Sequence, residues 1–232
     1  MNIALVLAGG VGLRTGLDMP KQFHIVKNKP IVIHTLEAFQ SHPSIDKIAV
    51  VCLSSYENML TDYAKRFGIT KLDLVVNGGS TSQESIKNGV EAIAELSNDD
   101  DIVIIHDGVR PMLNASVISG VIAKCQQYGA AAAAMPYNEQ VFVSYDGISS
   151  AEYIPRDNII RVQTPQAYKF KPLYEAYSAA YTENIGIEAS SYTNTMWVDL
   201  GNTLWFSPGS ERNFKITTSE DIQLFEALYE FS

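Results

Sequence analysis

The chain has 232 residues, enough for one well-buried α/β domain and too few for two large ones. Its hydrophobic content of 46% and charged content of 19% exclude an intrinsically disordered chain. A formal net charge of -9 argues against a nucleic-acid-binding surface, because such a surface needs a basic stripe.

The sequence carries no sign of secretion or of a membrane anchor. Apolar runs stay shorter than the roughly 18 residues of a membrane span, and the chain starts with a strand pattern instead of a charged leader. Cys52 and Cys125 fall in a predicted strand and a predicted helix, where they are expected as reduced, structural thiols. We therefore expect a cytoplasmic protein.

A glycine loop and two cations follow the first predicted strand. The apolar run over residues 3–7 is too short for a helix and suits a strand buried on both faces. It is followed by Gly9, Gly10 and Gly12, which let backbone N–H groups converge on phosphate oxygens without Cβ clashes. Arg14 adds a planar guanidinium fork, and Lys21 adds a mobile point charge. This pattern predicts a nucleoside triphosphate site.

Two common nucleotide-binding motifs do not match this loop. A dinucleotide-binding G-x-G-x-x-G fingerprint fails because Thr15 stands three positions after Gly12, and no acidic ribose partner follows at suitable spacing. A Walker loop fails because Lys21 is neither preceded by glycine nor followed by Ser or Thr. A tight turn with incidental glycines is the simplest alternative, and the nearby cations argue against it.

Strands and helices then alternate along the chain. Apolar runs predict strands over residues 47–53, 72–76, 101–105 and 130–135, and helical spacing predicts helices over 31–39, 56–67, 83–96 and 115–128. This alternation predicts an α/β fold with a Rossmann-like, mainly parallel sheet and helices on both faces. Ligands are then expected at the carboxyl ends of the strands.

The pattern changes over residues 137–161, which we call the arm. An apolar triplet at 141–143, a turn at Asp146-Gly147 and a second extended stretch ending near Ile160 predict a projecting hairpin. The remainder is expected to return to the sheet through residues 197–206. It should close with a helix over 219–231, with Thr217, Thr218 and Ser219 as cap candidates. We expect a single domain over residues 1–232 with the arm as an insertion.

Asp107 follows the apolar strand pattern at 102–105 after one intervening residue, which places it at the carboxyl-end rim beside the expected phosphate site. A hard divalent ion takes one or two carboxylates plus substrate phosphates and water, so a single rim aspartate suffices for magnesium. The competing interpretation is an aspartate that caps the turn before Arg110. His106 is expected to be packed or hydrogen-bonded and not catalytic.

Other polar residues fit phosphate contacts. Lys215 is expected in a short strand before the last helix, where it needs an anionic partner if buried, or else snorkels from a strand edge. Arg110 on the rim and Arg156 in the arm suit bidentate phosphate binding, although each could be a solvated surface charge. Ser85 could bond nucleotide or simply serve as a first-turn residue.

Five blocks of the sequence occur in the order of a known family. They are L-A-G-G-x-G-x-R with P-K-Q, Gly78-Gly79 with Ser85-Ile86, His106 to Pro111, Gln163 to Gln166, and Asn213 to Thr217 with Asp221. Together they resemble the cytidylyltransferases that activate sugar-alcohol phosphates, a group that includes the methylerythritol-phosphate and ribitol-5-phosphate cytidylyltransferases. The resemblance covers essentially the whole chain.

This resemblance implies attack by an acceptor phosphate on the α-phosphorus of CTP, with release of pyrophosphate. It implies Arg14, Lys21 and Lys215 as catalytic residues and Mg²⁺ on Asp107. The implied nucleotide-binding residues are Leu7, Ala8, Gly9, Gly10, Gly12, Gly79 and Ser85. The implied substrate-binding residues are Arg110, Gln140, Arg156 and Thr164. It also implies a homodimer, in which the arm crosses to a partner subunit and helps build its acceptor site.

Several positions depart from the family pattern on the acceptor and phosphate side. Glu139-Gln140 replaces a usual Asp-Thr in the arm, and the other departures are Ser82, Ile187 and Arg212. The Gln140 amide can both donate and accept hydrogen bonds, and its side chain is longer than that of threonine. These properties suit a hydroxyl-rich alditol chain. We therefore rank an alditol phosphate such as ribitol 5-phosphate, for surface-polymer synthesis, above methylerythritol phosphate, for isoprenoid synthesis.

A third hypothesis is a non-catalytic nucleotide-binding regulator that keeps the fold and has lost transfer. The departures at Ser82, Ile187 and Arg212 are its support. A protein that only binds nucleotide has less need of charges focused on one phosphorus. The charged residues that argue against this hypothesis are Arg14, Lys21, Asp107 and Lys215.

Overall fold

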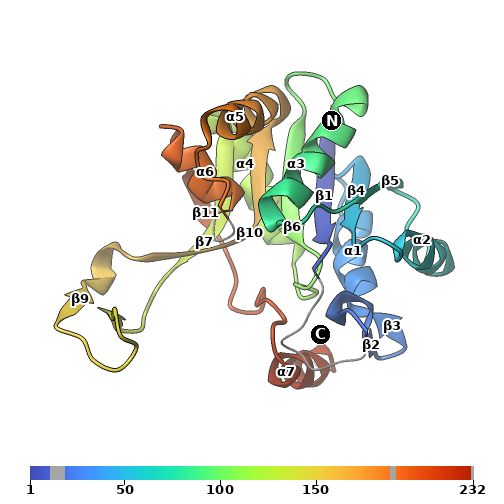
Figure 1. The fold of residues 1–232 in the computed structure, drawn as a ribbon. Helices are drawn as coiled ribbons and strands as arrows, with labels where there is room; N and C mark the ends of the chain where they lie inside the picture. Colours follow the sequence, from blue (N-terminus) through green and yellow to red (C-terminus); the bar gives the residue numbers. More distant parts are fainter. Residues whose placement is uncertain (11–18, 189–191, 231–232) are drawn as a thin grey trace.

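The computed structural model describes residues 1–10, 19–188 and 192–230, and a twisted sheet forms the centre of this part of the chain (Figure 1). Its seven strands follow the order β11-β7-β10-β6-β1-β4-β5. They are β1 (Asn2–Ala8), β4 (Lys47–Cys52), β5 (Leu72–Asn77), β6 (Ile102–Asp107), β7 (Ala130–Pro136), β10 (Ile160–Lys169) and β11 (Trp205–Pro208). Strand β10 runs antiparallel to both of its neighbours, and the other described pairings in this sheet are parallel.

Helices cover both faces of the sheet because the strands alternate apolar side chains to either side. On β1, Ala4, Val6 and Ala8 pack in one core with helices α1 (Ile31–Ser41), α2 (Glu57–Arg66) and α4 (Ala115–Tyr128). Ile3 and Leu5 face the opposite core with helices α3 (Ser82–Ala92), α5 (Phe170–Glu183) and α6 (Thr193–Asp199). The expected α/β fold with a mainly parallel sheet is confirmed.

A smaller apolar cluster lies beyond the carboxyl ends of the strands. The short strands β2 (Ile25–Val26) and β3 (Lys29–Pro30) pair there, and helix α7 (Ser219–Tyr229) packs against them at the bottom of Figure 1. Val26, Ile216 and Phe225 are buried in this cluster. The described residues also form three short 3-10 turns: η2 (Lys21–Phe23), η3 (Ala94–Leu96) and η4 (Arg156–Asn158).

The strand register brings the functional segments to one edge of the sheet. Leu7 of β1 lies beside Asp107 of β6, while Ala8 lies beside Cys52 and Cys52 beside Asn77. Because parallel strands end on the same side, the loops that follow β1, β5 and β6 converge there. Strand β10 is antiparallel, so its first half reaches the same edge.

Three expectations for the second half of the chain are wrong. Trp197 lies in helix α6, because Met196, Trp197 and Leu200 form an apolar face that packs against the sheet, and only Trp205–Pro208 forms a strand. The second strand of the hairpin ends at Ile154 instead of near Ile160, where a ten-residue strand of the central sheet begins. Lys215 is outside any strand.

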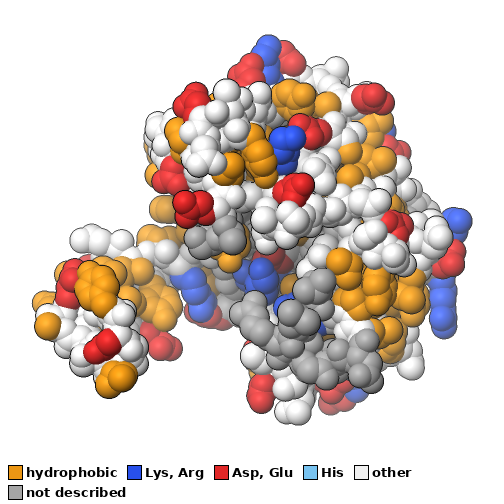
Figure 2. All heavy atoms as spheres, in the orientation of Figure 1, with side chains coloured by type: hydrophobic (Ala, Val, Ile, Leu, Met, Phe, Trp, Pro, Cys, Tyr) orange, Lys and Arg blue, Asp and Glu red, His pale blue; other side chains and the backbone are white. Residues whose placement is uncertain are grey.

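The arm leaves the sheet between β7 and β10 and projects from the body, at the lower left of Figure 1. Its two strands, β8 (Val141–Val143) and β9 (Glu152–Ile154), form an antiparallel pair. Exposed apolar side chains gather toward its end, with Tyr145 93% and Ile148 91% exposed. Figure 2 shows several hydrophobic side chains on the surface of this part of the arm, among polar and acidic ones.

Both cysteines are buried and free, as expected, and burial raises the pKa of each thiol to about 12. None of the described helices has the length and apolar character that crossing a bilayer requires.

Candidate active site

The two glycine blocks meet at the carboxyl edge of the sheet, and Ser85 lies at their junction. A Cβ added to Gly78 would lie 3.1 Å from the Ser85 hydroxyl, and one added to Gly9 would lie 3.7 Å from it. The Gly79 N–H donates to the same hydroxyl over 3.0 Å. The structure therefore brings together Gly9, Gly79 and Ser85, three of the nucleotide-binding residues that the resemblance implies.

Gln22 ties the start of the glycine loop to the body of the protein. Its side chain is 1% exposed, and its Nε2 donates to the carbonyl oxygens of Ala8 and Gly10, each over 2.8 Å. The carbonyl of Leu7 accepts the Gly108 N–H over 2.9 Å. These contacts hold three of the implied nucleotide-binding residues in place, Leu7, Ala8 and Gly10.

Lys21 lies in η2 directly before Gln22 and is buried, with 9% of its surface exposed. Two further residues expected at this site, Gly12 and Arg14, lie outside the described residues.

A charged cluster forms beside the glycine loop, with Asp107 at its centre. Asp107 Oδ1 accepts from Lys215 Nζ over 3.1 Å, and Oδ2 accepts from Arg110 Nε over 2.8 Å. The backbone N–H of Asp107 donates to the Thr164 hydroxyl over 3.2 Å. Four predicted site residues from three distant parts of the chain thus meet: Asp107, Arg110, Thr164 and Lys215.

The surrounding cations keep Asp107 ionised. Burial alone would raise the pKa of its carboxyl, but Lys215 and Arg110 outweigh burial and hold that pKa well below its usual range. Lys215 thereby has the anionic partner that its position requires, although its side chain is still 35% exposed. Figure 2 shows Lys and Arg side chains at the centre of this face, between the body and the arm.

Asp107 offers one carboxylate to a hard divalent cation, so such an ion would need further oxygen ligands from the substrates. No group of three or more His, Cys, Asp or Glu side chains that could hold a metal occurs within residues 1–10, 19–188 and 192–230. A single carboxylate suits magnesium when substrate phosphates supply further oxygens. Asp107 Oδ1 has a second lone pair besides the one directed at Lys215, whereas Oδ2 accepts from both Arg110 and, over 3.5 Å, the Thr164 hydroxyl.

His106 is fully buried next to this cluster, as expected for a packed histidine. Its Nε2 lies 3.3 Å from the Arg110 carbonyl oxygen, and its ring packs edge-on against Phe39. Burial lowers its pKa to about 3, so the ring is neutral.

Two buried amides support the cluster and were not assigned a role from the sequence. Asn213 donates to the Thr164 carbonyl over 2.7 Å, and Arg110 donates to the Asn213 carbonyl over 2.9 Å. Gln163 bonds the backbone of Ser210. Both amides fall within the matched sequence blocks, but their partners are distant in sequence, so local pattern gives no signal for them.

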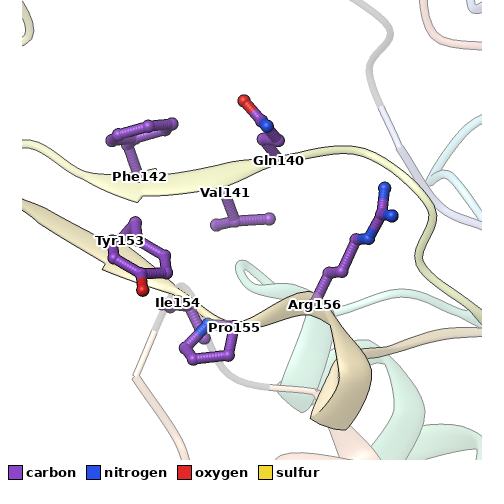
Figure 3. A pocket seen from close by; sticks show the side chains of 7 residues that line it. All are labelled: Gln140, Val141, Phe142, Tyr153, Ile154, Pro155 and Arg156. Carbon is purple, nitrogen blue, oxygen red and sulfur yellow. The ribbon is translucent and has the colours of Figure 1, made fainter.

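The arm holds the two remaining predicted site residues, Gln140 and Arg156. They line a groove of about 420 Å³ between the arm strands, together with Val141, Phe142, Tyr153, Ile154 and Pro155 (Figure 3). Arg156 donates to the Asn138 carbonyl over 3.2 Å, which is a contact within the arm. Since the arm projects from the body in Figure 1, the single chain does not bring these residues to Asp107.

Comparison with known proteins confirms the resemblance. The family model described as "IspD: 2-C-methyl-D-erythritol 4-phosphate cytidylyltransferase" matches residues 2–230. Ribitol-5-phosphate cytidylyltransferase of Lacticaseibacillus paracasei is 49% identical over 98% of this chain and 97% of its own length. The 2-C-methyl-D-erythritol 4-phosphate cytidylyltransferase of Clostridium tetani is 34% identical over 95% of this chain and 87% of its own.

Solved structures of cytidylyltransferases have the same fold as this chain. The Francisella tularensis 2-C-methyl-D-erythritol 4-phosphate cytidylyltransferase superposes with a TM-score of 0.81 at 27% identity, covering 97% of this chain and 98% of that one. The chain therefore belongs to the IspD family of cytidylyltransferases, which are CTP-dependent nucleotidyltransferases.

Proposed function

We propose that this protein transfers CMP from CTP to an alditol phosphate, with ribitol 5-phosphate as the acceptor, and releases pyrophosphate. The observation that carries the proposal is the cluster of Asp107, Arg110 and Lys215 beside the glycine loop. The choice of acceptor is supported by the 49% identity to a relative named ribitol-5-phosphate cytidylyltransferase. A CDP-alditol is an activated donor suited to surface-polymer synthesis, and we place that use in the cytoplasm.

The proposed chemistry is a single in-line displacement. An oxygen of the acceptor phosphate forms a bond to the α-phosphorus of CTP, and the bond from that phosphorus to the bridging oxygen breaks. Pyrophosphate leaves with the electron pair. Both reactants are polyanions, so the protein has mainly to align them and neutralise the charge that develops.

Different residues of the chain would bind the triphosphate, neutralise the reacting phosphate and hold the acceptor. The glycine loop and the Gly79–Ser85 junction would hold the triphosphate, while Lys21, Lys215 and Arg14 would neutralise the reacting phosphate. Arg110 would hold the acceptor phosphate on the rim. Mg²⁺, if bound at Asp107, would supply charge neutralisation between phosphate oxygens.

We also propose that the protein works as a homodimer whose arms exchange between subunits. The exposed apolar side chains of the arm support this, since Phe142 is 59% and Tyr153 is 67% exposed. Gln140 and Arg156 would then complete the acceptor site of the other subunit.

Methylerythritol phosphate is the second candidate acceptor, and the 34% identical relative of that name supports it. Pyrophosphate release with CTP should be measured for ribitol 5-phosphate, for methylerythritol 4-phosphate and without acceptor. We expect the fastest release with ribitol 5-phosphate. Faster release with methylerythritol phosphate would overturn the acceptor, and no release with a broad panel of polyol phosphates would favour the non-catalytic regulator.

Lys21→Ala tests the assignment of the catalytic cations. We expect turnover to fall by roughly 100-fold or more, because the variant removes charge stabilisation made in the transition state. Circular dichroism should show an unchanged fold. Near-normal turnover in a folded variant would contradict the assignment.

A further inference from the structure

The segment that carries Lys215 has no regular secondary structure, yet it must place an ammonium group against Asp107. Residues 209–217 lie between β11 and the start of α7 without forming a helix or strand. Lysine has a long, flexible stem, so the position of its Nζ depends on how firmly the backbone is held. The structure offers two buried amide side chains for this purpose, Gln163 and Asn213, which are 5% and 0% exposed.

Gln163 of β10 binds the segment as a backbone peptide group would. Its Nε2 donates to the Ser210 carbonyl over 2.9 Å, and its Oε1 accepts the Ser210 N–H over 3.2 Å. The adjacent residue must be small, because a Cβ added to Gly209 would lie 2.5 Å from Gln163 Oε1. The glutamine and the glycine are therefore fitted to one another.

Asn213 joins the segment to the charged cluster. Its Nδ2 donates to the Thr164 carbonyl over 2.7 Å and lies 3.4 Å from Gln163 Oε1. Both neighbours are carbonyl oxygens, so the NH₂ group must face them. The carbonyl of Asn213 itself accepts from Arg110 over 2.9 Å.

On the other side of Lys215, the backbone is held by a second anchor. The Ile216 N–H donates to the Val109 carbonyl over 2.9 Å, and the Ile216 side chain is fully buried. The backbone is thus held on both sides of Lys215, at Asn213 and at Ile216, and Lys215 Nζ donates to Asp107 over 3.1 Å.

We propose that Gln163 and Asn213 are positioning residues for nucleotidyl transfer, acting through Lys215. They do not touch the substrates; they hold the backbone from which Lys215 reaches the reacting phosphate. The inference rests on the proposed function, since it takes Lys215 as a group that stabilises the transition state.

The test is a double-mutant cycle between Gln163→Met and Lys215→Ala. Methionine keeps the length of the side chain and removes the amide. We expect Gln163→Met to lower kcat by roughly 10-fold or more, because small misplacement of a catalytic group is costly, with KM for CTP nearly unchanged. In the Lys215→Ala background, the same substitution should change kcat by less than about 2-fold, since the group it positions is gone.

Gln166→Met is the matched control. Gln166 is also a buried glutamine of β10, 6% exposed, but it accepts from the Tyr168 hydroxyl instead of binding residues 209–213. Any effect of Gln166→Met should be equal in both backgrounds. Asn213→Ala replaces Gln163→Met in the cycle if that variant does not fold, and the same lack of additivity is expected.

The outcomes separate the inference from the proposed function. If Gln163→Met slows Lys215→Ala as much as it slows the wild type, the coupling is absent and the inference is wrong, while the proposed function stands. If Lys215→Ala alone has normal kcat, the catalytic assignment of Lys215 fails and the inference falls with it.

Discussion

Gln22 connects the glycine loop to the buried part of the site through a single amide. Gln22→Met keeps the volume and removes both hydrogen bonds, each of which contributes about 1 kcal/mol in typical proteins. We expect KM for CTP to rise by about 30-fold as the loop loses its alignment, because the two bonds together contribute about 2 kcal/mol and 1.4 kcal/mol corresponds to a factor of ten. KM for the acceptor should change little.

A buried glutamine elsewhere provides the comparison. Gln83 is also 1% exposed, and its amide bonds the Gly186 carbonyl and the Tyr177 hydroxyl, neither of which belongs to the glycine loop. Gln83→Met should lower thermal stability and leave KM for CTP near the wild-type value. An equal rise in KM for the two variants would mean that Gln22 acts only through general stability.

His106 makes the stability of the protein depend on pH. Its pKa is about 3 in the folded state and near 6.5 when unfolded, so the unfolded chain binds the proton more readily. The stability that His106 contributes is complete above pH 6.5 and is lost as pH falls toward 3. Between about pH 7.5 and about pH 5, this one group should lower the free energy of unfolding by about 2 kcal/mol.

The measurement is urea unfolding of the wild type and His106→Leu at both pH values. The variant should lose about 2 kcal/mol less on acidification, even if it is less stable at neutral pH. The pKa values of His34 and His42 are also lowered by burial, and they act in both proteins. An identical pH dependence in the two proteins would show that His106 is not the responsible group.

The charged residues of the site could be predicted from the sequence, and the uncharged ones that hold them could not. Asp107 and Lys215 stand out because a charge beside an apolar strand or helix needs a partner. Asn213 and Gln163 have no such mark, since an amide is tolerated almost anywhere on a surface. Their importance comes from burial and from partners that only the tertiary fold supplies.

Among the elements, the alternating first half of the chain was predictable and β10 was not. Helix α4 occupies the predicted residues 115–128, because its apolar positions recur with helical spacing. In β10, polar residues at 163, 164 and 166 interrupt the apolar run, although Gln163 and Gln166 are buried. A strand whose polar side chains serve the site gives a weak periodic signal.

Helix α7 begins shortly after Lys215 in the chain, on the side opposite to Asn213. Asp221 accepts the backbone N–H groups of Thr217 and Thr218, over 2.7 and 2.8 Å, and Thr218 caps the helix in return. Asp221→Ala should cost about 1 kcal/mol of stability, as loss of a helix cap does. Thermal unfolding measures this.

The same variant should have a second effect on catalysis. Because Thr217 lies two residues after Lys215, a frayed helix start loosens that side of the segment, and kcat should fall with it. Glu220→Ala is the control, since Glu220 is also in the first turn, but its carboxylate bonds the side chains of Thr218 and Ser219, whereas the backbone N–H groups of Thr217 and Thr218 donate to Asp221. Equal loss of kcat in both variants would contradict this role of Asp221.

At the scale of the whole molecule, the predicted site residues fall into two groups, one on the body and one on the arm. Asp107, Arg110 and Lys215 lie on the body, whereas Gln140 and Arg156 lie on a hairpin that projects away from it. An arm with Tyr145 and Ile148 almost fully exposed would be an unusual surface for a monomer. The proposed two-fold dimer with exchanged arms would cover that surface and would unite the two groups of predicted site residues.

Mixing two inactive variants tests whether the arms exchange. Lys21→Ala removes a body residue, and Arg156→Ala removes an arm residue. If Arg156 serves the partner subunit, a mixed dimer has one site that lacks both side chains and one that is intact. An equal mixture that exchanges subunits at random should then regain about a quarter of wild-type activity, because half of the dimers are mixed and each has one working site.

Each variant alone should be almost inactive, and sedimentation velocity should show dimers in both preparations and in the mixture. If Arg156 instead serves its own subunit, every site in a mixed dimer lacks either Lys21 or Arg156, and mixing restores no activity. The presence or absence of recovery therefore distinguishes arms that exchange from arms that fold back on their own subunit.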